Sequence, residues 1–421
     1  MYQFAHQQMG ARRLLGALAV VAMLGAACSS DDDDGAGDDG AVDTSVLGEL
    51  DLAEGEPFKV GYAVDAGGEA VDTSENKVAG EATQEYINRH LGGIAGRPLD
   101  ITFCDTRNSS ATATECINQF VQGGMSAIFV SSSGNGETLA SEAAEAGIPY
   151  VVYLGATAPE LTNPNSFSLS GSAVSILGGP GIVMQQRELT KLGLLTIDVP
   201  TATQAVQLLA TPAYRAAGLE LELIPVPPGT ADMSANVASA LDSEMWLVLG
   251  DAAFCTTALD AIQTQAPDTP IFMAQACVSA DSAADLPKGY EGVLTSGSIR
   301  LDPSDPEEDL FRAVLAEYSP GDLGGTAEGF LADAFATVLG FARMMEGYTG
   351  DGAPASVAEH LRGATALLPL GGGIEIACGQ SPIAILTSLC SMGSWLTELD
   401  ADGNQTSFER IDVTPFFAPE G

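Results

Sequence analysis

The sequence predicts an α/β protein with two lobes, each built on a doubly wound parallel sheet. Two observations lead to this fold class. Short apolar segments alternate with helical segments of about ten to fifteen residues in two successive series, the pattern of βαβ units on parallel sheets. In addition, about 365 residues follow the N-terminal region, which is too many for one ordinary core, so two domains are expected.

The first series starts at Phe58, where a strand-like apolar run precedes a loop rich in Gly and Asp at 65–73. In the helix that follows, Ala79, Ala82 and Tyr86 recur at helical spacing and predict a buried face. The strands expected in this series are 58–64, 99–104, 127–130 and 148–153, and its helices are 78–89, 111–122 and 137–146.

The second series starts near Ser170 and repeats the same order of elements. Its expected helices are 175–192, 203–217, 234–241 and 256–265, and its strands are 194–197, 219–225, 245–249 and 271–274. Ligands of open α/β sheets bind beyond the carboxyl ends of the strands, so the loops at those ends form the candidate site.

The pattern changes after Ser298, where the expected helices are 310–317, 326–346 and 355–361. The apolar stripe of the middle helix, from Phe330 to Phe341, indicates core packing. Residues 395–408 predict a closing hairpin around the turn pair Asp402-Gly403. The same turn only partly matches a calcium loop, because the downstream ligand spacing is wrong, so no metal site is expected there.

The N-terminus predicts export. Arg12 and Arg13 precede an uncharged, mostly apolar run that ends at Ala27. This run is shorter than the roughly 20 residues that span a bilayer, so residues 1–27 are expected to be a signal peptide. The alternative is a buried N-terminal helix of a cytosolic protein. The segment Leu24-Gly25-Ala26-Ala27-Cys28 resembles a bacterial lipobox, which implies that Cys28 carries a lipid and anchors the protein to the outer face of the bacterial cell membrane.

Acidic, Gly-rich composition follows Cys28, and residues 28–56 are expected to form a lipidated, disordered tether. The tract Asp31 to Asp34 resembles a calcium-binding run, although a spacer is the simpler interpretation. The chain has a formal net charge of −40 and only four lysines. This charge argues against nucleic acid or an anionic membrane surface as a partner, so the lipid is the only membrane contact expected.

Six cysteines remain once Cys28 is assigned to the lipid, and sequence alone cannot choose among their fifteen pairings. They fall into three couples separated by 12, 22 and 12 residues, which makes local pairing the simplest choice. We therefore predict the disulfides Cys104–Cys116, Cys255–Cys277 and Cys378–Cys390. A structural metal site would need CxxC pairs or clustered histidines, and the three histidines lie far apart, so no metal is expected.

Several segments resemble the type I periplasmic-binding-protein family, in particular its leucine/isoleucine/valine-binding branch. They are, in order, Tyr86 to Asn88 with Gly92 to Leu99, Cys116 to Val121, Ser131 to Ser133, Ala146 to Tyr150, and Gly155 to Thr162. The resemblance implies two lobes joined by a hinge of three crossovers, near Gly171, Gly297 and Ala364. The N-terminal lobe would then comprise 57–170 plus 299–363, and the C-terminal lobe 171–298 plus 364–421.

The resemblance also implies a binding site. In this family, the positions matching Ser131, Ala156 and Thr157 hold the α-carboxylate and α-amino group of the ligand, and Ser132 and Gly155 belong to the same segments. Hydroxyls and backbone N–H groups at strand ends and helix N-termini suit a carboxylate, because they donate hydrogen bonds and the helix dipole favours an anion. The alternative is that these are ordinary turn and N-cap residues.

The second lobe departs from the family pattern. The acid that meets the ligand's ammonium group would fall at about Ala276, where there is no carboxylate. Asp251, at a neighbouring strand end, could replace that acid or could cap the following helix, and the sequence leaves both interpretations open. A cleft for a small ligand is expected, whereas specificity for branched-chain amino acids is not implied.

The resemblance implies an extracytoplasmic receptor of an ABC importer, with an amino acid or similar small polar molecule as ligand and ABC permease subunits as partners. A sensor of the same fold that signals to a membrane protein is the alternative, and permease and ATPase genes beside this one would favour transport. No enzyme activity and no cofactor are expected. The chain lacks GxSxG, GxxxxGK[ST] and HExxH motifs, and Gly134-Asn135-Gly136 lacks the third glycine of a dinucleotide fingerprint.

Overall fold

The computed structural model describes residues 42–67, 72–319 and 330–418, which belong to one compact unit. The predicted signal peptide and the lipobox cysteine Cys28 lie outside the described residues. Within these ranges, every helix is too short or too polar to cross a membrane.

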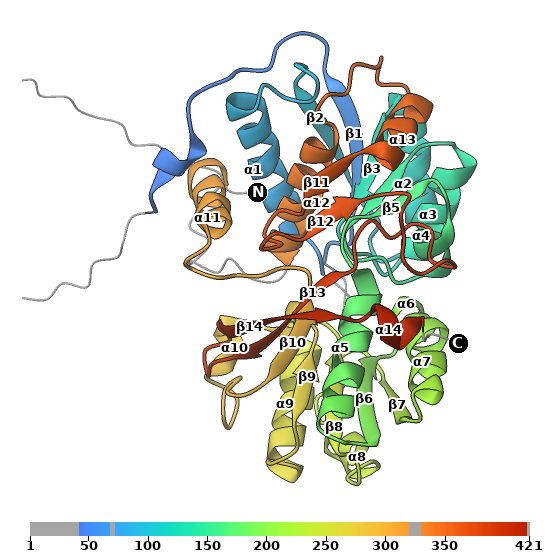
Figure 1. The fold of residues 1–421 in the computed structure, drawn as a ribbon, viewed down its shortest axis with the longest axis vertical. Coiled ribbons are helices and arrows are strands. Elements are labelled where there is room, and N and C mark those ends of the chain that lie inside the picture. Colours follow the sequence, from blue (N-terminus) through green and yellow to red (C-terminus); the bar gives the residue numbers. More distant parts are fainter. Residues whose placement is uncertain (1–41, 68–71, 320–329, 419–421) are drawn as a thin grey trace, which may run out of the picture. The chain divides into compact units, whose positions relative to one another are not determined.

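The first sheet is parallel and has the strand order β2-β1-β3-β4-β5 (Figure 1). Its strands are β1 (Phe58–Val64), β2 (Leu99–Asp105), β3 (Ala127–Val130), β4 (Tyr150–Val152) and β5 (Ser166–Ser168). Its helices are α1 (Glu75–His90), α2 (Ser110–Gly123), α3 (Gly136–Glu145), α4 (Ala158–Thr162), α11 (Pro306–Tyr318), α12 (Phe330–Met344) and α13 (Pro354–Gly363).

Alternation along the strands buries both faces of this sheet. In β1, Phe58, Val60 and Tyr62 join the core formed with α1, α11 and α12, whereas Ala63 points to the opposite face, into the core formed with α2 and α3. A parallel sheet is normally covered on both faces in this way, which explains why its strands are almost continuously apolar.

The second sheet has the order β14-β13-β10-β9-β8-β6-β7, with β13 and β14 antiparallel at one edge. Its strands are β6 (Lys191–Ile197), β7 (Glu220–Val226), β8 (Met245–Leu249), β9 (Ile271–Met273), β10 (Leu294–Gly297), β13 (Gly393–Leu399) and β14 (Gln405–Asp412). Its helices are α5 (Ser172–Gln186), α6 (Pro200–Ala205), the π-helical turn η2 (Val206–Ala210), α7 (Thr211–Ala216), α8 (Ser234–Ala238), α9 (Ala252–Gln265), the 3-10 turn η3 (Gln275–Cys277), α10 (Ala280–Ala283) and α14 (Thr414–Phe417).

Local sequence signals set where the helices start. Asp305 caps α11 by accepting a hydrogen bond from the backbone N–H of Glu307 at 3.0 Å, and Pro306 occupies the first helical position. The hairpin of β13 and β14 turns at 400–404, as predicted, and Gly403 adopts the positive φ of 94° that this turn requires.

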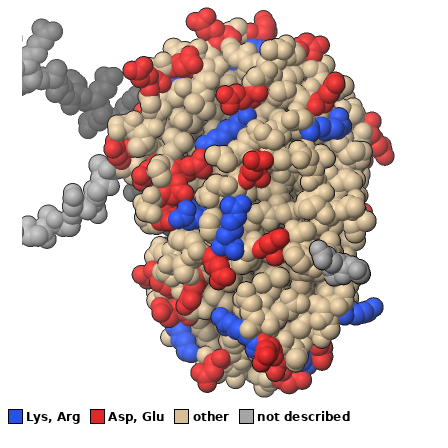
Figure 2. All heavy atoms as spheres, in the orientation of Figure 1, with Lys and Arg blue, Asp and Glu red and all other residues tan. Residues whose placement is uncertain are grey.

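All three predicted disulfides are confirmed: Cys104–Cys116, Cys255–Cys277 and Cys378–Cys390 are bonded, with Cα–Cα distances of 5.6, 5.3 and 4.0 Å. The first joins the end of β2 to α2, the second joins α9 to η3, and the third closes the loop after β12 (Glu375–Ala377). Acidic side chains are scattered over the face shown in Figure 2, in keeping with the net charge of −40.

The prediction of a disordered tether over 28–56 is wrong for its last part. A 3-10 turn, η1 (Thr44–Leu47), is formed, and Leu47 is buried in the first core. The backbone N–H groups of Asp51 and Ala53 donate to the carbonyl oxygens of Arg89 and Asn88 at the end of α1, at 2.8 and 2.9 Å. These bonds and one buried leucine order a segment whose composition alone suggested disorder.

The predicted domain boundary at Ala364 is also wrong. The strands β11 (Thr365–Leu367) and β12 pair with each other, and Leu368, Ile374 and Ile376 beside them fill the first core. The chain therefore stays with the first lobe until after Cys378 and enters the second sheet at β13. It still passes between the two sheets three times, after β5, after β10 and before β13.

Candidate binding site

A cavity lies where the carboxyl ends of strands from both sheets meet. It has two adjoining compartments that share Leu154, Ile176 and Ala274 in their walls. The larger, about 150 Å³, is called here the apolar compartment, and the smaller, about 50 Å³, the polar compartment. Both compartments lie at the strand ends where the loops of an open α/β sheet normally bind a ligand.

Aliphatic side chains dominate the apolar compartment. They come from α5, from α6 and from the ends of β6 and β8, and include Leu177, Ile197, Val199 and Leu249. Polar groups are few, namely Ser132 and Ser133 after β3, Thr201 in α6 and Asp251 after β8. A cavity of about this volume with apolar walls accommodates a molecule the size of benzene.

The polar compartment has a different chemistry. Hydroxyls and amides line it: Ser170, Ser172, Ser175, Ser296, Ser298, Thr295, Thr397, Gln275 and Gln405. Most of these hydroxyls already have partners within the protein; Ser298, for example, donates to the carbonyl oxygen of Gly393 at 2.9 Å. Ser175 is the exception, because its buried hydroxyl has no hydrogen-bond partner among the described residues.

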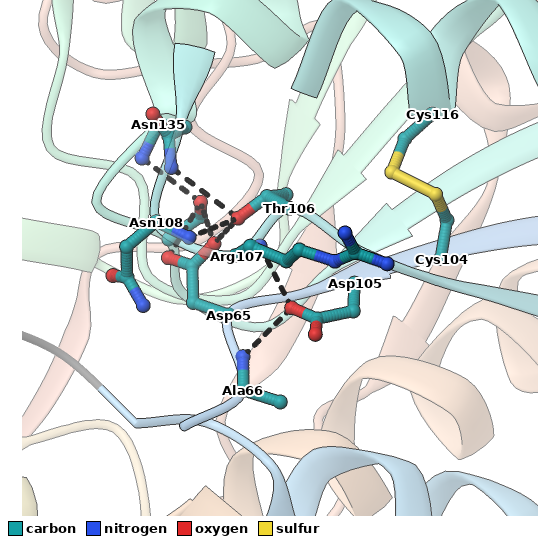
Figure 3. Close-up of a disulfide and its surroundings, with 10 residues drawn as sticks. Asp65, Ala66, Cys104, Asp105, Thr106, Arg107, Asn108, Cys116 and Asn135 are labelled. Atoms are coloured by element: carbon teal, nitrogen blue, oxygen red, sulfur yellow. Dashed lines mark hydrogen bonds between the residues drawn. A yellow bond between two sulfur atoms is a disulfide. The ribbon is translucent and has the colours of Figure 1, made fainter. Parts of the chain in front are cut away.

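The carboxylate of Asp65, at the end of β1, fixes the loop that follows β3 (Figure 3). It accepts hydrogen bonds from the backbone N–H of Gly134 at 2.7 Å and from the Ser133 hydroxyl at 3.0 Å, and the Thr106 hydroxyl also donates to it. This buried network holds Ser132, Ser133 and Gly134 in the wall of the apolar compartment. The sequence analysis missed Asp65, although an acid directly after a parallel strand was the available signal.

Two predicted site residues lie behind the cavity wall. Ser131 is fully buried, and its hydroxyl is hydrogen-bonded to the hydroxyls of Tyr62 and Thr337, the latter at 3.1 Å. Thr157 is buried as well, and its hydroxyl donates to Glu160 Oε2 at 2.9 Å. Neither residue lines either compartment.

Glu160 binds the donors that the resemblance assigned to a ligand carboxylate. The backbone N–H groups of Ala156 and Thr157 both donate to Glu160 Oε2, at 3.0 Å each, in addition to the Thr157 hydroxyl. The Tyr150 hydroxyl donates to Glu160 Oε1 at 2.9 Å. Burial raises the pKa of Glu160, and these four hydrogen bonds oppose that rise because they stabilise the charged form.

The remaining predicted residues lie at or beside the apolar compartment. Ser132, Ala156 and Asp251 line it, whereas Gly155 is buried behind it and donates its N–H to the Ser172 hydroxyl at 3.0 Å. Asp251 caps α9, because its Oδ1 accepts the backbone N–H of Phe254 at 2.9 Å. The helix-cap interpretation of Asp251 is therefore observed, and the same side chain borders the cavity.

Asp333 in α12 lines the polar compartment and was also missed. Burial raises the pKa of this carboxyl to about 8. Among the described residues, no side chain or backbone group donates a hydrogen bond to its carboxylate; only its backbone carbonyl is engaged, by the Thr337 hydroxyl at 2.7 Å. A lone acid in the apolar sequence Phe330 to Phe341 was the available signal.

A hydrogen bond in the wall of the apolar compartment joins residues of the two lobes. The Thr201 hydroxyl, in α6 of the second lobe, donates to the backbone carbonyl of Gly134 in the first lobe at 2.6 Å. Within the part of the chain that the structure describes, no cluster of His, Cys, Asp and Glu could hold a metal ion.

Comparisons with known proteins agree with this architecture. Residues 57–385 match the family model described as periplasmic binding protein. A solute-binding protein from R. palustris in complex with 4-hydroxybenzoate has a TM-score of 0.68 and 16% identity, over 86% of this chain and 99% of that one. A fatty acid ABC transporter substrate-binding protein from Thermomonospora curvata has a TM-score of 0.70 and 15% identity, over 87% and 96%.

A branched-chain amino acid transporter substrate-binding protein from Streptococcus pneumoniae, in complex with isoleucine, has a TM-score of 0.67 and 13% identity, over 85% of this chain and 100% of that one. At these identities the similarity concerns the fold, and the three neighbours are associated with solutes of different chemistry. No curated protein matches the chain.

Proposed function

Because this chain belongs to the periplasmic binding protein family, we propose that it is the solute-binding receptor of an ABC importer. The predicted type I fold is confirmed by the match over 57–385 and by the solved neighbours. The observation that carries the proposal is the cavity at the strand ends of both sheets, with aliphatic residues around one compartment and hydroxyl- and amide-bearing residues around the other. The solute would be a small molecule held between the lobes and passed on to ABC permease subunits.

The chemistry of the walls refines the expected solute. The resemblance implied an amino acid or similar small polar molecule, held by Ser131, Ala156 and Thr157. In this chain Glu160 already binds the Thr157 hydroxyl and the N–H groups of Ala156 and Thr157. A solute with a substantial apolar body fits the larger compartment better than a purely polar one. The solutes named for the three solved neighbours, 4-hydroxybenzoate, fatty acid and isoleucine, support such a body.

Location and partners follow from the same proposal. Export by residues 1–27 and lipidation at Cys28 would place the receptor on the outer face of the bacterial cell membrane, where the lipid is its only membrane contact. Turnover of the solute is not expected, because the described residues that line the cavity include no nucleophile paired with a base and an orienting group.

A thermal-shift screen of the purified chain tests the proposal. Amino acids, aromatic acids, fatty acids, amides and amines form the panel, and a solute at one hundred times its Kd should stabilise the protein by about 2.7 kcal/mol. Ala202→Phe, which places a large ring in the apolar compartment, should abolish the shift. Ala216→Phe, on the exposed face of the adjoining helix α7, is the matched control and should retain it. A panel without any stabilising compound, or a bound solute recovered chemically changed, would contradict the proposal.

A further inference from the structure

The polar compartment contains one acid and no base. Asp333 is the only charged side chain that lines it, and no Lys or Arg lines either compartment among the residues described. No group of the described protein donates a hydrogen bond to its carboxyl oxygens, so the protein itself does not satisfy their hydrogen-bonding capacity. Asp333 is partly buried, and a carboxylate removed from water without a partner is unfavourable, which suggests that another molecule completes the site.

A second group in the same compartment also lacks a partner. Ser175 is 1% exposed, lines the compartment from the first turn of α5, and its hydroxyl makes no hydrogen bond within the described protein. The neighbouring hydroxyls differ, because Ser296 donates to the Ser175 carbonyl at 3.0 Å, and Thr295 and Thr397 bond each other at 2.5 Å. Asp333 and Ser175, whose side chains make no hydrogen bond within the described protein, therefore line the same small compartment.

The groups around Asp333 do not supply a compensating positive charge. Tyr62 from β1 and Tyr153 after β4 are the titratable side chains that face it, and burial raises the pKa of both phenols, so both are neutral. Arg300, which follows the lining residue Ile299, stacks on the Trp395 ring at 5.3 Å and is paired with Asp302 and Asp305. The other lining residues carry hydroxyls, amides or apolar groups.

We propose that the solute is an amine whose protonated nitrogen binds at Asp333 in the polar compartment while its apolar body fills the larger compartment. An ammonium group has three donors and no acceptor, which complements a carboxylate beside a free hydroxyl oxygen. Leu154, Ile176 and Ala274 line both compartments, so the compartments adjoin, and a solute that bridges them would lie against these three side chains. This assignment rests on the proposed function, since it names the class of solute that the receptor carries.

A carboxylic acid is the competing class of solute. The pH dependence of affinity distinguishes an amine from an acid. In the unliganded protein the Asp333 carboxyl has a pKa of about 8, so it is mostly protonated at neutral pH. A cation binds the ionised form, so its affinity should rise about tenfold per pH unit below pH 8 and level off above it. An anion would need the protonated form as a donor, so its affinity should be lost as the pH rises through 8.

The experiment uses isothermal titration calorimetry on the purified chain between pH 6 and 9. The probes are 2-phenylethylamine and 3-methylbutylamine, each compared with the alcohol and the acid that carry the same body. Alkylamines resemble the lysine side chain, whose pKa is about 10.4, so they stay protonated over this range. We expect at least one of the amines to bind at least ten times more tightly than the alcohol and the acid with the same body. The affinity of that amine should rise with pH up to about 8.

Two variants test the residues. Asp333→Asn should weaken amine binding roughly ten- to hundredfold and flatten the pH profile, because the charge-assisted contact is removed. Ser175→Ala should weaken it several-fold. Asp260→Asn, an identical change on the exposed face of α9, is the matched control and should bind like wild type. If Asp333→Asn does not fold, the pH dependence of amine binding by the wild-type chain still tests the assignment.

The assignment is overturned if neither amine binds, if an acid binds more tightly than its amine, or if Asp333→Asn binds the amine like wild type. These failures leave the receptor function standing as long as any solute of the broader screen stabilises the chain. Failure of that whole screen would instead remove the receptor function and the amine assignment together.

Discussion

The hydroxyl of Thr201 and the backbone carbonyl of Gly134, which belong to different lobes, are joined by a hydrogen bond of 2.6 Å. Asp65 holds Gly134 in place, because its carboxylate accepts a hydrogen bond from the Gly134 N–H at 2.7 Å. The contact therefore links the second lobe to a part of the first lobe that is itself fixed. Hinge motion between two such lobes is typical of ligand-binding proteins of this kind, and this bond is one that opening must break.

Thr201→Val removes this bond and keeps the side-chain shape. We expect solute binding to weaken about two- to tenfold, since one neutral hydrogen bond contributes about 0.5–1.5 kcal/mol to the closed form. Thr203→Val, which removes a local bond to the Val199 carbonyl on the same helix, is the control. Calorimetry measures the affinity for the solute. Small-angle scattering measures how far the two lobes close. Equal affinity in both variants would show that the bond does not stabilise the closed form.

Thr157→Val separates two roles for the loop after β4. Loss of the Thr157 hydroxyl leaves a buried oxygen of Glu160 without this donor, which predicts a loss of about 1–3 kcal/mol in the free energy of unfolding, with nearly unchanged binding. The family resemblance predicts the reverse, namely weak binding at unchanged stability. Thr162→Val, on the exposed side of α4, is the control and should cost less than about 0.5 kcal/mol. Denaturant unfolding and calorimetry on the same samples decide between the two.

Asp333→Asn should stabilise the unliganded protein at pH 8. The pKa of this carboxyl is raised to about 8 in the folded protein from an ordinary value of 3.8, so the folded state binds its proton more tightly than the unfolded state. The contribution of Asp333 to the stability of the wild type is therefore most favourable below pH 3.8, and it falls as the pH rises to about 8. The stability difference between Asp333→Asn and wild type should grow over this range, on the order of 1 kcal/mol or more at its end. A difference that stays constant with pH would contradict the assignment.

Loss of the Cys104–Cys116 disulfide should affect the site as well as stability. The bond closes a loop of 12 residues, and in the chain-entropy model such a loop contributes about 3 kcal/mol. Asp105 and Thr106 directly follow Cys104 and belong to the hydrogen-bonded group around Asp65 (Figure 3). The double substitution Cys104→Ser and Cys116→Ser should lower the melting temperature and weaken solute binding. The Cys378–Cys390 disulfide also closes a loop of 12 residues, but it is not part of the group around Asp65. The double substitution Cys378→Ser and Cys390→Ser should therefore lower the melting temperature without weakening solute binding.

Cys28→Ala tests the proposed anchor. In a bacterial host, the wild-type chain should fractionate with membranes and incorporate labelled fatty acid, because lipidation supplies the only membrane contact proposed. The variant should lose the label and appear in the soluble fraction. A variant that stays on the membrane would show that another segment holds it there.

Much of the fold could be predicted because it depends on a repeated pattern. Alternating apolar strands and amphipathic helices specify parallel sheets whatever the individual residues are. The strands β1 and β3 have the predicted bounds. The segment 44–56 could not be predicted, because a single buried Leu47 and a few backbone hydrogen bonds order it.

The site was harder, because it depends on which partners the side chains choose. Thr157 and Glu160 have the spacing of a capping box, which indicates that their donors and acceptors satisfy each other. Asp333 was hidden by its apolar neighbours on α12, since a helix that is mostly core suggests no ligand contact. Only the three-dimensional packing shows that this one side chain reaches the cavity.

Glu160 has a consequence for how a solute enters. Because an internal carboxylate already holds the hydroxyl of Thr157 and the N–H groups of Ala156 and Thr157, the loop after β4 keeps its conformation without any solute present. A binding wall that is preorganised in this way loses little conformational entropy on complex formation, and that loss normally subtracts from affinity. For this part of the cavity, the rate of capture should therefore be set by diffusion and lobe opening, with no separate folding step of the loop.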